Sequence, residues 1–129
     1  MKDRVIVITG ASAGIGAALA KQAHAAGARP VLVARRAAAL AEVSAACGGA
    51  RAVVADMTKR AEVERVVADV LAHEGHVDVW VNNVGRGITR APSELTDADL
   101  DEMMTINVKS ALYGMQAVLP HFKARGAGH

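Results

Sequence analysis

Residues 9–16 are the first part of the sequence whose residue types and spacing could do chemistry. They follow an apolar run and read Thr-Gly-Ala-Ser-Ala-Gly-Ile-Gly, with glycines at Gly10, Gly14 and Gly16. A glycine-rich turn that opens a helix can point free backbone N–H groups and the positive end of the helix at a phosphate. The spacing is G-x-x-x-G-x-G, and no Lys-Ser/Thr pair follows the second glycine as a P-loop requires. The segment predicts a phosphate cradle, although a glycine-rich connector without a ligand fits the same pattern.

Two arginines follow the next apolar run. The chain there reads Val33-Ala34-Arg35-Arg36, with no acidic residue. In dinucleotide-binding folds an acid at this strand end accepts a hydrogen bond from the ribose 2′-OH of the non-phosphorylated cofactor. The planar fork of arginine suits a 2′-phosphate instead, so the pair favours NADP(H) over NAD(H). The alternative is a pair of solvated arginines at a helix start, where cations are disfavoured.

Three further polar positions stand out. Asp56 follows a third apolar run, where it suits a ligand site or a helix cap equally well. Asn82 and Asn83 follow a fourth run, where amides also satisfy the backbone groups of turns. Asn107 falls inside the apolar stripe of a helix, and a buried amide without partners costs about 1–3 kcal/mol. Asn107 therefore either bonds neighbouring backbone or has a functional role.

Two kinds of apolar periodicity alternate along the chain and define the elements that must position these residues. Continuous apolar runs, typical of strands buried on both faces, cover residues 5–8, 31–34, 52–55 and 77–81. Helical spacing covers residues 15–26, 37–47, 63–71 (with Thr58 as the cap) and 96–119 (with a capping box from Thr96). This βαβαβαβα order predicts one α/β domain over residues 1–129, a Rossmann-like doubly wound parallel sheet with helices on both faces. Ligands of such sheets bind at the carboxyl ends of the strands, where the polar positions fall.

Composition excludes several classes of partner. Hydrophobic residues make up 52% of the 129 residues, with one Trp, one Tyr and one Phe, so the core is aliphatic and a base-stacking nucleic-acid binder is excluded. A net charge of +2 is too small for a polyanion or a membrane partner. The single cysteine, Cys47, and scattered histidines indicate neither a disulfide nor a metal site. No stretch has the pattern of a signal peptide or a membrane span, so we expect a soluble, cytoplasmic protein.

With these motifs in this order, the sequence resembles the short-chain dehydrogenase/reductase family over its whole length. Residues 9–16 match the family's T-G-x-x-x-G-x-G motif, and residues 82–85 match its N-N-A-G motif with Val84 in place of Ala. Asp56 with Met57 matches the family's acid near the adenine ring, and Ile106-Asn107-Val108 matches the segment with its helix asparagine. The resemblance implies a strand order of 3-2-1-4. It also implies a set of cofactor-binding residues: Gly10, Ser12, Ala13, Gly14, Ile15, Gly16, Arg35, Arg36, Asp56, Met57, Asn83, Val84 and Gly85.

The family's features bear on cofactor choice and catalysis. The position of Arg35 resembles that of family members that prefer NADP(H), although Ala13 stands where many of those members have a basic residue. For Asn107 the resemblance implies a catalytic role, holding a water in a proton relay to a lysine. The family's Ser and Tyr-x-x-x-Lys, on a fifth strand and the helix after it, are not among the 129 residues. The only tyrosine, Tyr113, is followed four residues later by Ala117, and we expect it in the core or at an interface.

The resemblance therefore implies the N-terminal, cofactor-binding half of an oxidoreductase, truncated before the fifth strand and inactive alone. The whole enzyme would transfer hydride between the nicotinamide of NADP(H) and a small carbonyl or alcohol substrate. One alternative is a nucleotide-binding module without catalysis, and another is a flavodoxin-like domain that binds a different nucleotide.

Two expectations concern surfaces. Without a fifth strand, residues 77–81 would form an exposed apolar edge and make the chain poorly soluble. The methionine-bearing stripe of the last helix belongs to the core or to a helix–helix interface. Because the family pairs this helix across a dimer interface, the resemblance implies a homo-oligomer.

Overall fold

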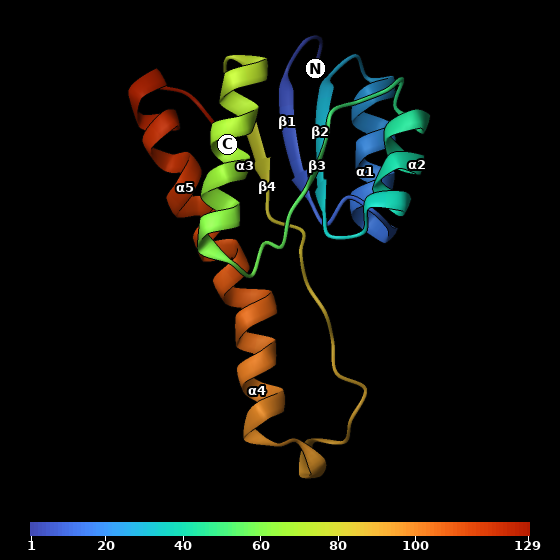
Figure 1. Ribbon diagram of the computed structural model, residues 1–129, viewed down its shortest axis with the longest axis vertical. Coiled ribbons are helices and arrows are strands. Elements are labelled where there is room, and N and C mark those ends of the chain that lie inside the picture. The colour runs from blue at the N-terminus through green and yellow to red at the C-terminus, as the bar shows by residue number, and fades with distance from the viewer.

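Four parallel strands form one sheet in the computed structural model, which describes residues 1–129. The strands are β1 (Val5–Thr9), β2 (Arg29–Ala34), β3 (Ala52–Val54) and β4 (Val79–Val81). Their order across the sheet is β3-β2-β1-β4, which confirms the predicted Rossmann-like arrangement. Because all four run the same way, their carboxyl ends lie along one edge, at the bottom in Figure 1.

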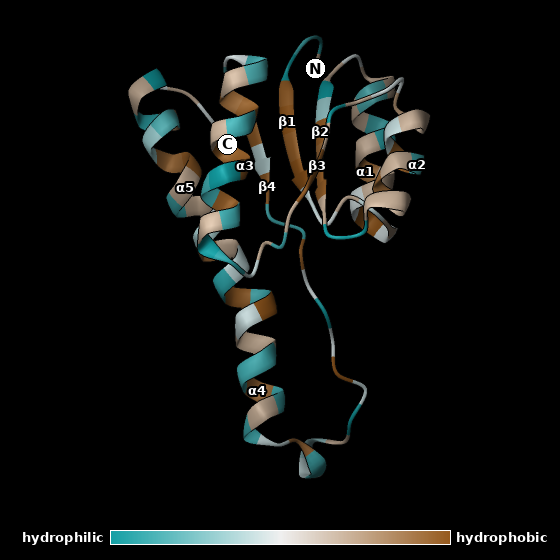
Figure 2. Ribbon diagram, viewed as in Figure 1, coloured by the Kyte–Doolittle hydropathy of each residue, from teal (hydrophilic) through white to brown (hydrophobic).

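Helices cover both faces of the sheet (Figure 1). α1 (Gly14–Ala25) and α2 (Ala37–Ala46) pack on one face, and α3 (Arg60–Glu74) and α5 (Ser110–Arg125) pack on the other. Every side chain of β1 is buried, which explains why this strand is a continuous β-branched run. Figure 2 shows the same pattern as hydrophobic colour concentrated on the strands. None of the helices combines the length and apolar character that crossing a membrane requires.

The start of β4 differs from the prediction, since the strand begins at Val79 and not at Val77. Side chains, not a neighbouring strand, take the backbone groups of Val77: its N–H donates to the ring of His121, and its carbonyl accepts from Arg125. Asp78 makes the link to β1, where its carboxylate accepts the N–H of Val5 at 2.8 Å. The backbone N–H of Asp78 also donates to the carbonyl of Val5 at 3.0 Å, so the bonding to β1 continues beyond the start of the strand.

The edge of β4 is only partly exposed. The N–H of Trp80 donates to the carbonyl of His129 at 2.8 Å, and the N–H of His129 donates to the carbonyl of Asp78 at 3.0 Å. This is the bonding pattern of a parallel pair, with His129 beside Val79. The side chain of Trp80 is also buried. The expectation of a fully exposed apolar edge is therefore wrong at these residues.

The prediction that Thr58 caps the third helix is also wrong. α3 begins at Arg60, after Lys59, and no side chain caps it. The Thr58 hydroxyl donates to Asp56 Oδ1 instead, at 2.7 Å. A Thr hydroxyl can bond either a nearby side chain or the free N–H groups of a helix start. Here it bonds Asp56, and the start of α3 is left without a side-chain cap.

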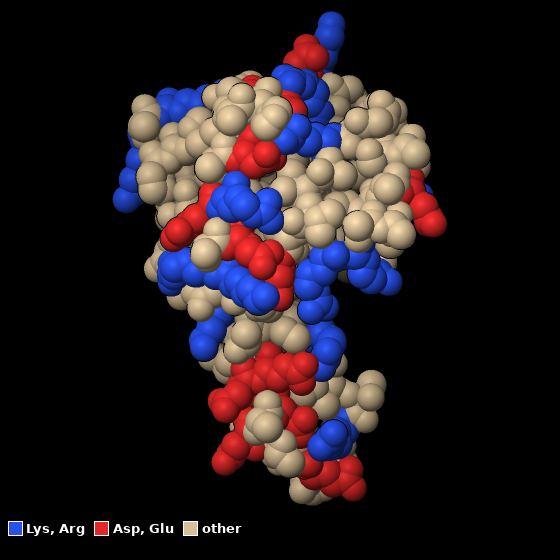
Figure 3. Space-filling model, viewed as in Figure 1, with Lys and Arg blue, Asp and Glu red and all other residues tan.

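The last helical segment is a long rod that runs past the carboxyl edge of the sheet (Figure 1). It consists of α4 (Asp97–Met103), a π-helical turn (Met104–Lys109) and α5, and a 3-10 turn (Pro92–Glu94) precedes it. Thr96 and Asp99 bond reciprocally in the predicted capping box. Figure 3 shows acidic side chains gathered over α4.

Most of the apolar stripe on this rod faces solvent. Met104 is 51% exposed and Met115 45% exposed, so the core alternative is wrong for them. The exposed members of the stripe are Leu100, Met104, Val108, Leu112, Met115 and Leu119. The interface alternative stays a prediction. Tyr113 does pack against the core, with the guanidinium of Arg60 stacked 4.3 Å from its ring centre.

Candidate functional site: a crevice at the carboxyl edge of the sheet

A crevice of about 480 Å³ opens at the carboxyl ends of the strands. Its walls are the loops that follow β1, β2, β3 and β4, together with one residue of the π-helical turn. The lining residues are Gly10, Ser12, Ala13, Gly14, Ile15, Ala34, Arg35, Arg36, Ala55, Asp56, Met57, Thr58, Asn83, Val84, Gly85, Arg86 and Ile106. The crevice reaches the boundary between β1 and β4, where connections leave the sheet in opposite directions, and open α/β sheets bind ligands at such a point.

The loop after β1 forms a tight turn against the start of α1. Gly10 has a φ of +66°, which a residue with a side chain rarely adopts. Gly16 lies so close to that turn that a Cβ there would be 2.4 Å from the Gly10 carbonyl oxygen. No side chain caps α1, and its first turn holds no acidic residue. The N–H groups of that turn are therefore available to an anion in the crevice.

Asn83 ties this loop to the end of β4. Its side-chain N–H group donates to the carbonyls of Thr9 and Gly10, at 3.1 and 3.3 Å. Its backbone N–H donates to the Thr9 hydroxyl, which in turn donates to the carbonyl of Val81. Thr9 is fully buried, so this network replaces water at the edge of the sheet. The alternative that Asn83 satisfies backbone groups is correct, and the backbone it satisfies belongs to the glycine loop.

Asp56 lies in the loop after β3 with one carboxylate oxygen engaged. Its Oδ1 accepts from the N–H and the hydroxyl of Thr58, at 3.0 and 2.7 Å, and its Oδ2 bonds no protein group. Burial raises the pKa of Asp56, but the bonds from Thr58 and the charges of Arg35 and Lys59 outweigh it, so the pKa lies below its usual value. Asp56 is thus an anion with one free acceptor in the crevice, and it does not cap α3.

Arg35 and Arg36 line the crevice beside the glycine loop. Both side chains are exposed, and Arg35 makes no hydrogen bond or ion pair within the protein. Arg36 donates to the Ser12 hydroxyl across a long 3.4 Å. Asp56 is near enough for its charge to act on Arg35, but neither guanidinium group forms an ion pair with a carboxylate, so both can bind an anion from solution.

Asn107 lies outside the crevice lining, in the π-helical turn. It is only partly buried, so the expectation of a buried amide is wrong. Its Oδ1 accepts the N–H of Arg86 at 2.8 Å, and its Nδ2 donates to the Arg86 carbonyl at 2.9 Å. A π-turn inserts one extra residue in the helix. Here the turn contains Asn107, whose side-chain amide bonds the loop after β4.

The structure brings the predicted cofactor residues together, except Gly16, which is buried behind the turn. Five lining residues were not predicted: Ala34, Ala55, Thr58, Arg86 and Ile106. Each is adjacent in the chain to a predicted residue, so extending each motif by one residue would have found them.

Comparisons with known proteins agree on one family. The family model for short chain dehydrogenase matches residues 4–129. An uncharacterised oxidoreductase of Staphylococcus epidermidis is 35% identical over 130 residues, which cover 100% of this chain and 56% of that protein. Fatty acyl-CoA reductase of Acinetobacter baylyi is 38% identical over 134 residues, which cover 99% of this chain and 45% of that protein.

Solved structures show the same likeness in three dimensions. A short-chain dehydrogenase from Streptomyces avermitilis has a TM-score of 0.91 and 39% identity, covering 99% of this chain and 47% of that one. The 3-ketoacyl-(acyl-carrier-protein) reductase from Brucella melitensis, complexed with NADH, has a TM-score of 0.92 and 33% identity, covering 97% of this chain and 52% of that one. The chain thus spans about half the length of the proteins it matches. By its sequence and its fold, the chain belongs to the short-chain dehydrogenase family.

Proposed function

We propose that the crevice binds a nicotinamide dinucleotide, and that the protein is an oxidoreductase acting on a carbonyl or alcohol substrate. The observation that carries the proposal is the meeting of an uncapped helix start, a free carboxylate oxygen and two exposed guanidinium groups in one crevice. Family membership supports it, as does the NADH bound to the Brucella reductase. When bound, the nicotinamide supplies or accepts the hydride.

Each part of the crevice suits one part of such a cofactor. The N–H groups at the start of α1 suit the pyrophosphate, because no side chain caps them and the glycine turn before them lines the crevice. Asp56 and Met57 suit the adenine ring, since they offer a free acceptor at Asp56 Oδ2 on the β3 side. Residues 83–85 lie across the crevice, beside β4, and suit the nicotinamide side.

We further propose that the protein prefers NADP(H) over NAD(H). Arg35 and Arg36 follow β2, where a binder of NAD(H) places an acid for the ribose 2′-OH. A 2′-phosphate would give both guanidinium groups an ion-pair partner, which no carboxylate of the protein provides. Ala13, which also lines the crevice, adds no charge, so the preference rests on the arginine pair.

Arg35→Asp tests this preference in the purified protein. We expect the Kd for NADPH to rise about 10- to 100-fold, as the loss of a charged hydrogen bond of about 1.5–3 kcal/mol predicts, and the Kd for NADH to change less than about threefold. Lys21→Asp, on the exposed side of α1, makes the same change in net charge and controls for it. Equal effects of Arg35→Asp on the two cofactors would exclude a contact with the 2′-phosphate.

Asn107 is our proposed catalytic residue among those present. An amide oxygen accepts two hydrogen bonds and an amide nitrogen donates two, and Arg86 uses one of each. The side chain can therefore hold the loop after β4 and a relay water at the same time. Because the 129 residues contain no Tyr-x-x-x-Lys, we infer that they bind the cofactor without transferring hydride by themselves.

A second candidate is a nucleotide-binding module without catalysis, which needs only the crevice itself. The two candidates differ in an assay of NADPH oxidation with carbonyl substrates by the protein that carries this chain. Turnover supports the oxidoreductase, and saturable NADPH binding without turnover of any carbonyl supports the module.

We also propose that the protein is a homo-oligomer joined through the exposed stripe on α4 and α5. Six large apolar side chains on one rod form a surface that is unusual for a monomer. Leu112→Glu places a charge in the middle of the stripe and should reduce the mass measured by light scattering to that of one subunit. A wild-type protein that is already monomeric at high concentration would exclude this proposal.

A further inference from the structure

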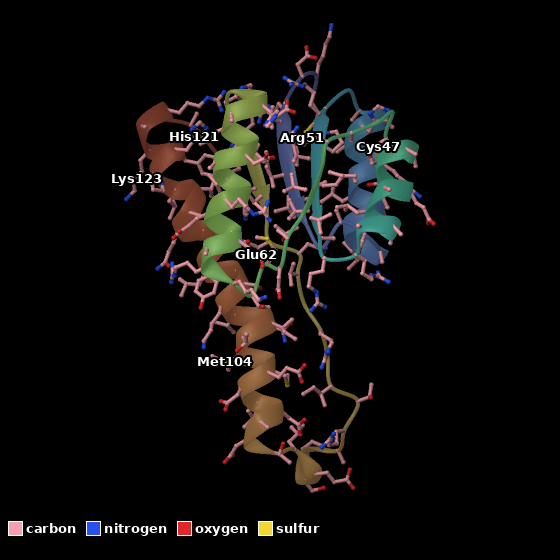
Figure 4. The ribbon with its side chains drawn as sticks, viewed as in Figure 1. Cys47, Arg51, Glu62, Met104, His121 and Lys123 are labelled. Carbon is pink, nitrogen blue, oxygen red and sulfur yellow. The ribbon has the colours of Figure 1, made fainter.

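Glu62 reaches back from the first turn of α3 to the loop after β3 (Figure 4). Its Oε2 accepts the N–H of Asp56 at 2.6 Å. A glutamate at this third helical position ordinarily bonds the N–H of the residue just before the helix, here Lys59. Glu62 instead bonds a residue six positions earlier, so its carboxylate stabilises the loop and not the helix end.

Other bonds hold the same stretch of backbone. The N–H of Ala55 donates to the carbonyl of Ala34 in β2 at 3.0 Å, and Arg65 donates to the carbonyl of Val54 at 2.9 Å. Lys59 and Arg65 flank the Glu62 carboxylate at 3.7 and 4.0 Å. The loop is therefore fixed by β2 on one side and by the first turns of α3 on the other.

This fixed backbone decides what the crevice offers. Thr58 occupies Asp56 Oδ1, so Oδ2 is the free acceptor, and the N–H of the next residue, Met57, bonds nothing within the chain. An acceptor and a donor on consecutive residues match the amino group and the neighbouring ring nitrogen of an adenine. The positions of this acceptor and this donor depend on the backbone at Asp56, and the N–H of Asp56 is bonded to Glu62.

We propose that Glu62 is a positioning residue for the adenine end of the cofactor, acting through the backbone of Asp56. The inference rests on the proposed cofactor. Glu62 does not line the crevice, so it acts without touching the ligand. It keeps the Asp56 carboxylate and the Met57 N–H aligned before the nucleotide arrives, which lowers the ordering required on binding.

The test compares NADPH with its hypoxanthine analogue, in which an oxo group replaces the adenine amino group. The wild-type protein should bind NADPH more tightly, because the analogue presents an oxygen to Asp56 Oδ2 and a protonated ring nitrogen to the Met57 N–H, so neither hydrogen bond forms. Glu62→Ala should reduce this preference about two- to tenfold, the range set by the net value of one hydrogen bond. A ratio of two Kd values does not depend on the folded fraction, so partial unfolding of the variant does not imitate the effect.

Two further variants sharpen the result. Glu62→Gln keeps an oxygen that can accept the Asp56 N–H, and should retain the wild-type preference. Glu64→Ala removes an exposed glutamate of the same helix that makes no hydrogen bond or ion pair, and should also retain it.

The outcomes separate this inference from the proposed function. A wild-type preference that survives in Glu62→Ala, or that is lost equally in Glu62→Gln, overturns the role of Glu62 and leaves the cofactor proposal standing. A folded wild-type protein that binds neither nucleotide overturns the cofactor proposal, and the role of Glu62 with it.

Discussion

Gly16→Ala tests whether the glycine turn and α1 must touch. A Cβ at residue 16 would lie 2.4 Å from the Gly10 carbonyl oxygen and 2.6 Å from Asn83 Nδ2, where ordinary contact begins at 3.4 Å. The turn and the helix start would therefore separate by about 1 Å. Overpacking of this kind costs about 1–3 kcal/mol, and alanine recovers at most about 1 kcal/mol through its higher helix propensity. The two close atoms are a backbone carbonyl oxygen and an amide nitrogen that two hydrogen bonds hold, so we expect a cost near the upper end, about 2–3 kcal/mol, and a net loss of about 1–2 kcal/mol.

Two measurements follow from this displacement. The melting temperature should fall by roughly 3–8 °C, as that free energy predicts for a chain of this size. The Kd for NADPH, measured by calorimetry, should rise about 10- to 100-fold, because the N–H groups of α1 would no longer point at the pyrophosphate.

Gly87→Ala is the matched control, because a Cβ there meets no atom within 4 Å and the residue has an ordinary φ. If Gly16→Ala matches Gly87→Ala in both melting temperature and Kd, the close contact has no role in forming the cradle.

Two predictions concern the other side of the sheet. Gly114→Ala would place a Cβ 2.5 Å from Asn82 Oδ1 and 2.6 Å from Trp80 Nε1, so we expect a loss of about 1–3 kcal/mol in unfolding free energy and a shifted emission of Trp80, the only tryptophan. Unchanged stability and emission would mean that α5 does not pack against β4 at this glycine. Asp78→Asn should lower the unfolding free energy by about 1–3 kcal/mol at pH 7. Burial raises the pKa of Asp78. Hydrogen bonds from Arg125 and the Val5 N–H, together with nearby positive charges, outweigh burial, so the pKa lies below its usual value. The stabilisation by the ionised Asp78 carboxylate is therefore present above the pKa of about 3.9 that an Asp has in an unfolded chain. It is lost as the pH falls through the lower pKa that Asp78 has in the folded protein. Denaturant unfolding at several pH values should show the wild type and the variant converging below about pH 4, and a constant difference down to pH 2 would contradict the assignment.

The alternation of strands and helices and the position of the crevice were predictable from the sequence because both follow from short-range patterns, whereas the strand order was implied by the family resemblance. Apolar runs define buried strands, and the motifs fall directly after those runs, so parallel strands bring them to one edge. The glycine spacing predicted the tight turn for the same reason, since Gly10 needs a positive φ and Gly16 allows close contact.

What the sequence did not predict depends on which of several nearby partners a polar side chain bonds. Thr58 has the pattern of a helix cap, yet its hydroxyl bonds Asp56. Glu62 is placed to bond the residue before its helix, yet its carboxylate accepts the Asp56 N–H. Asn107 was expected to be buried because a stripe indicates which side chains share a face, but not whether that face is covered.

The most direct test of the account is an NADPH titration followed through the backbone amide signals of the isotope-labelled protein. We predict saturable shift changes concentrated in the glycine loop, the start of α1 and the loops after β2, β3 and β4, with the Met57 amide among the largest. The absence of saturable changes in a folded protein, or changes centred on α4 and α5 and not on the crevice, would contradict the proposed cofactor site.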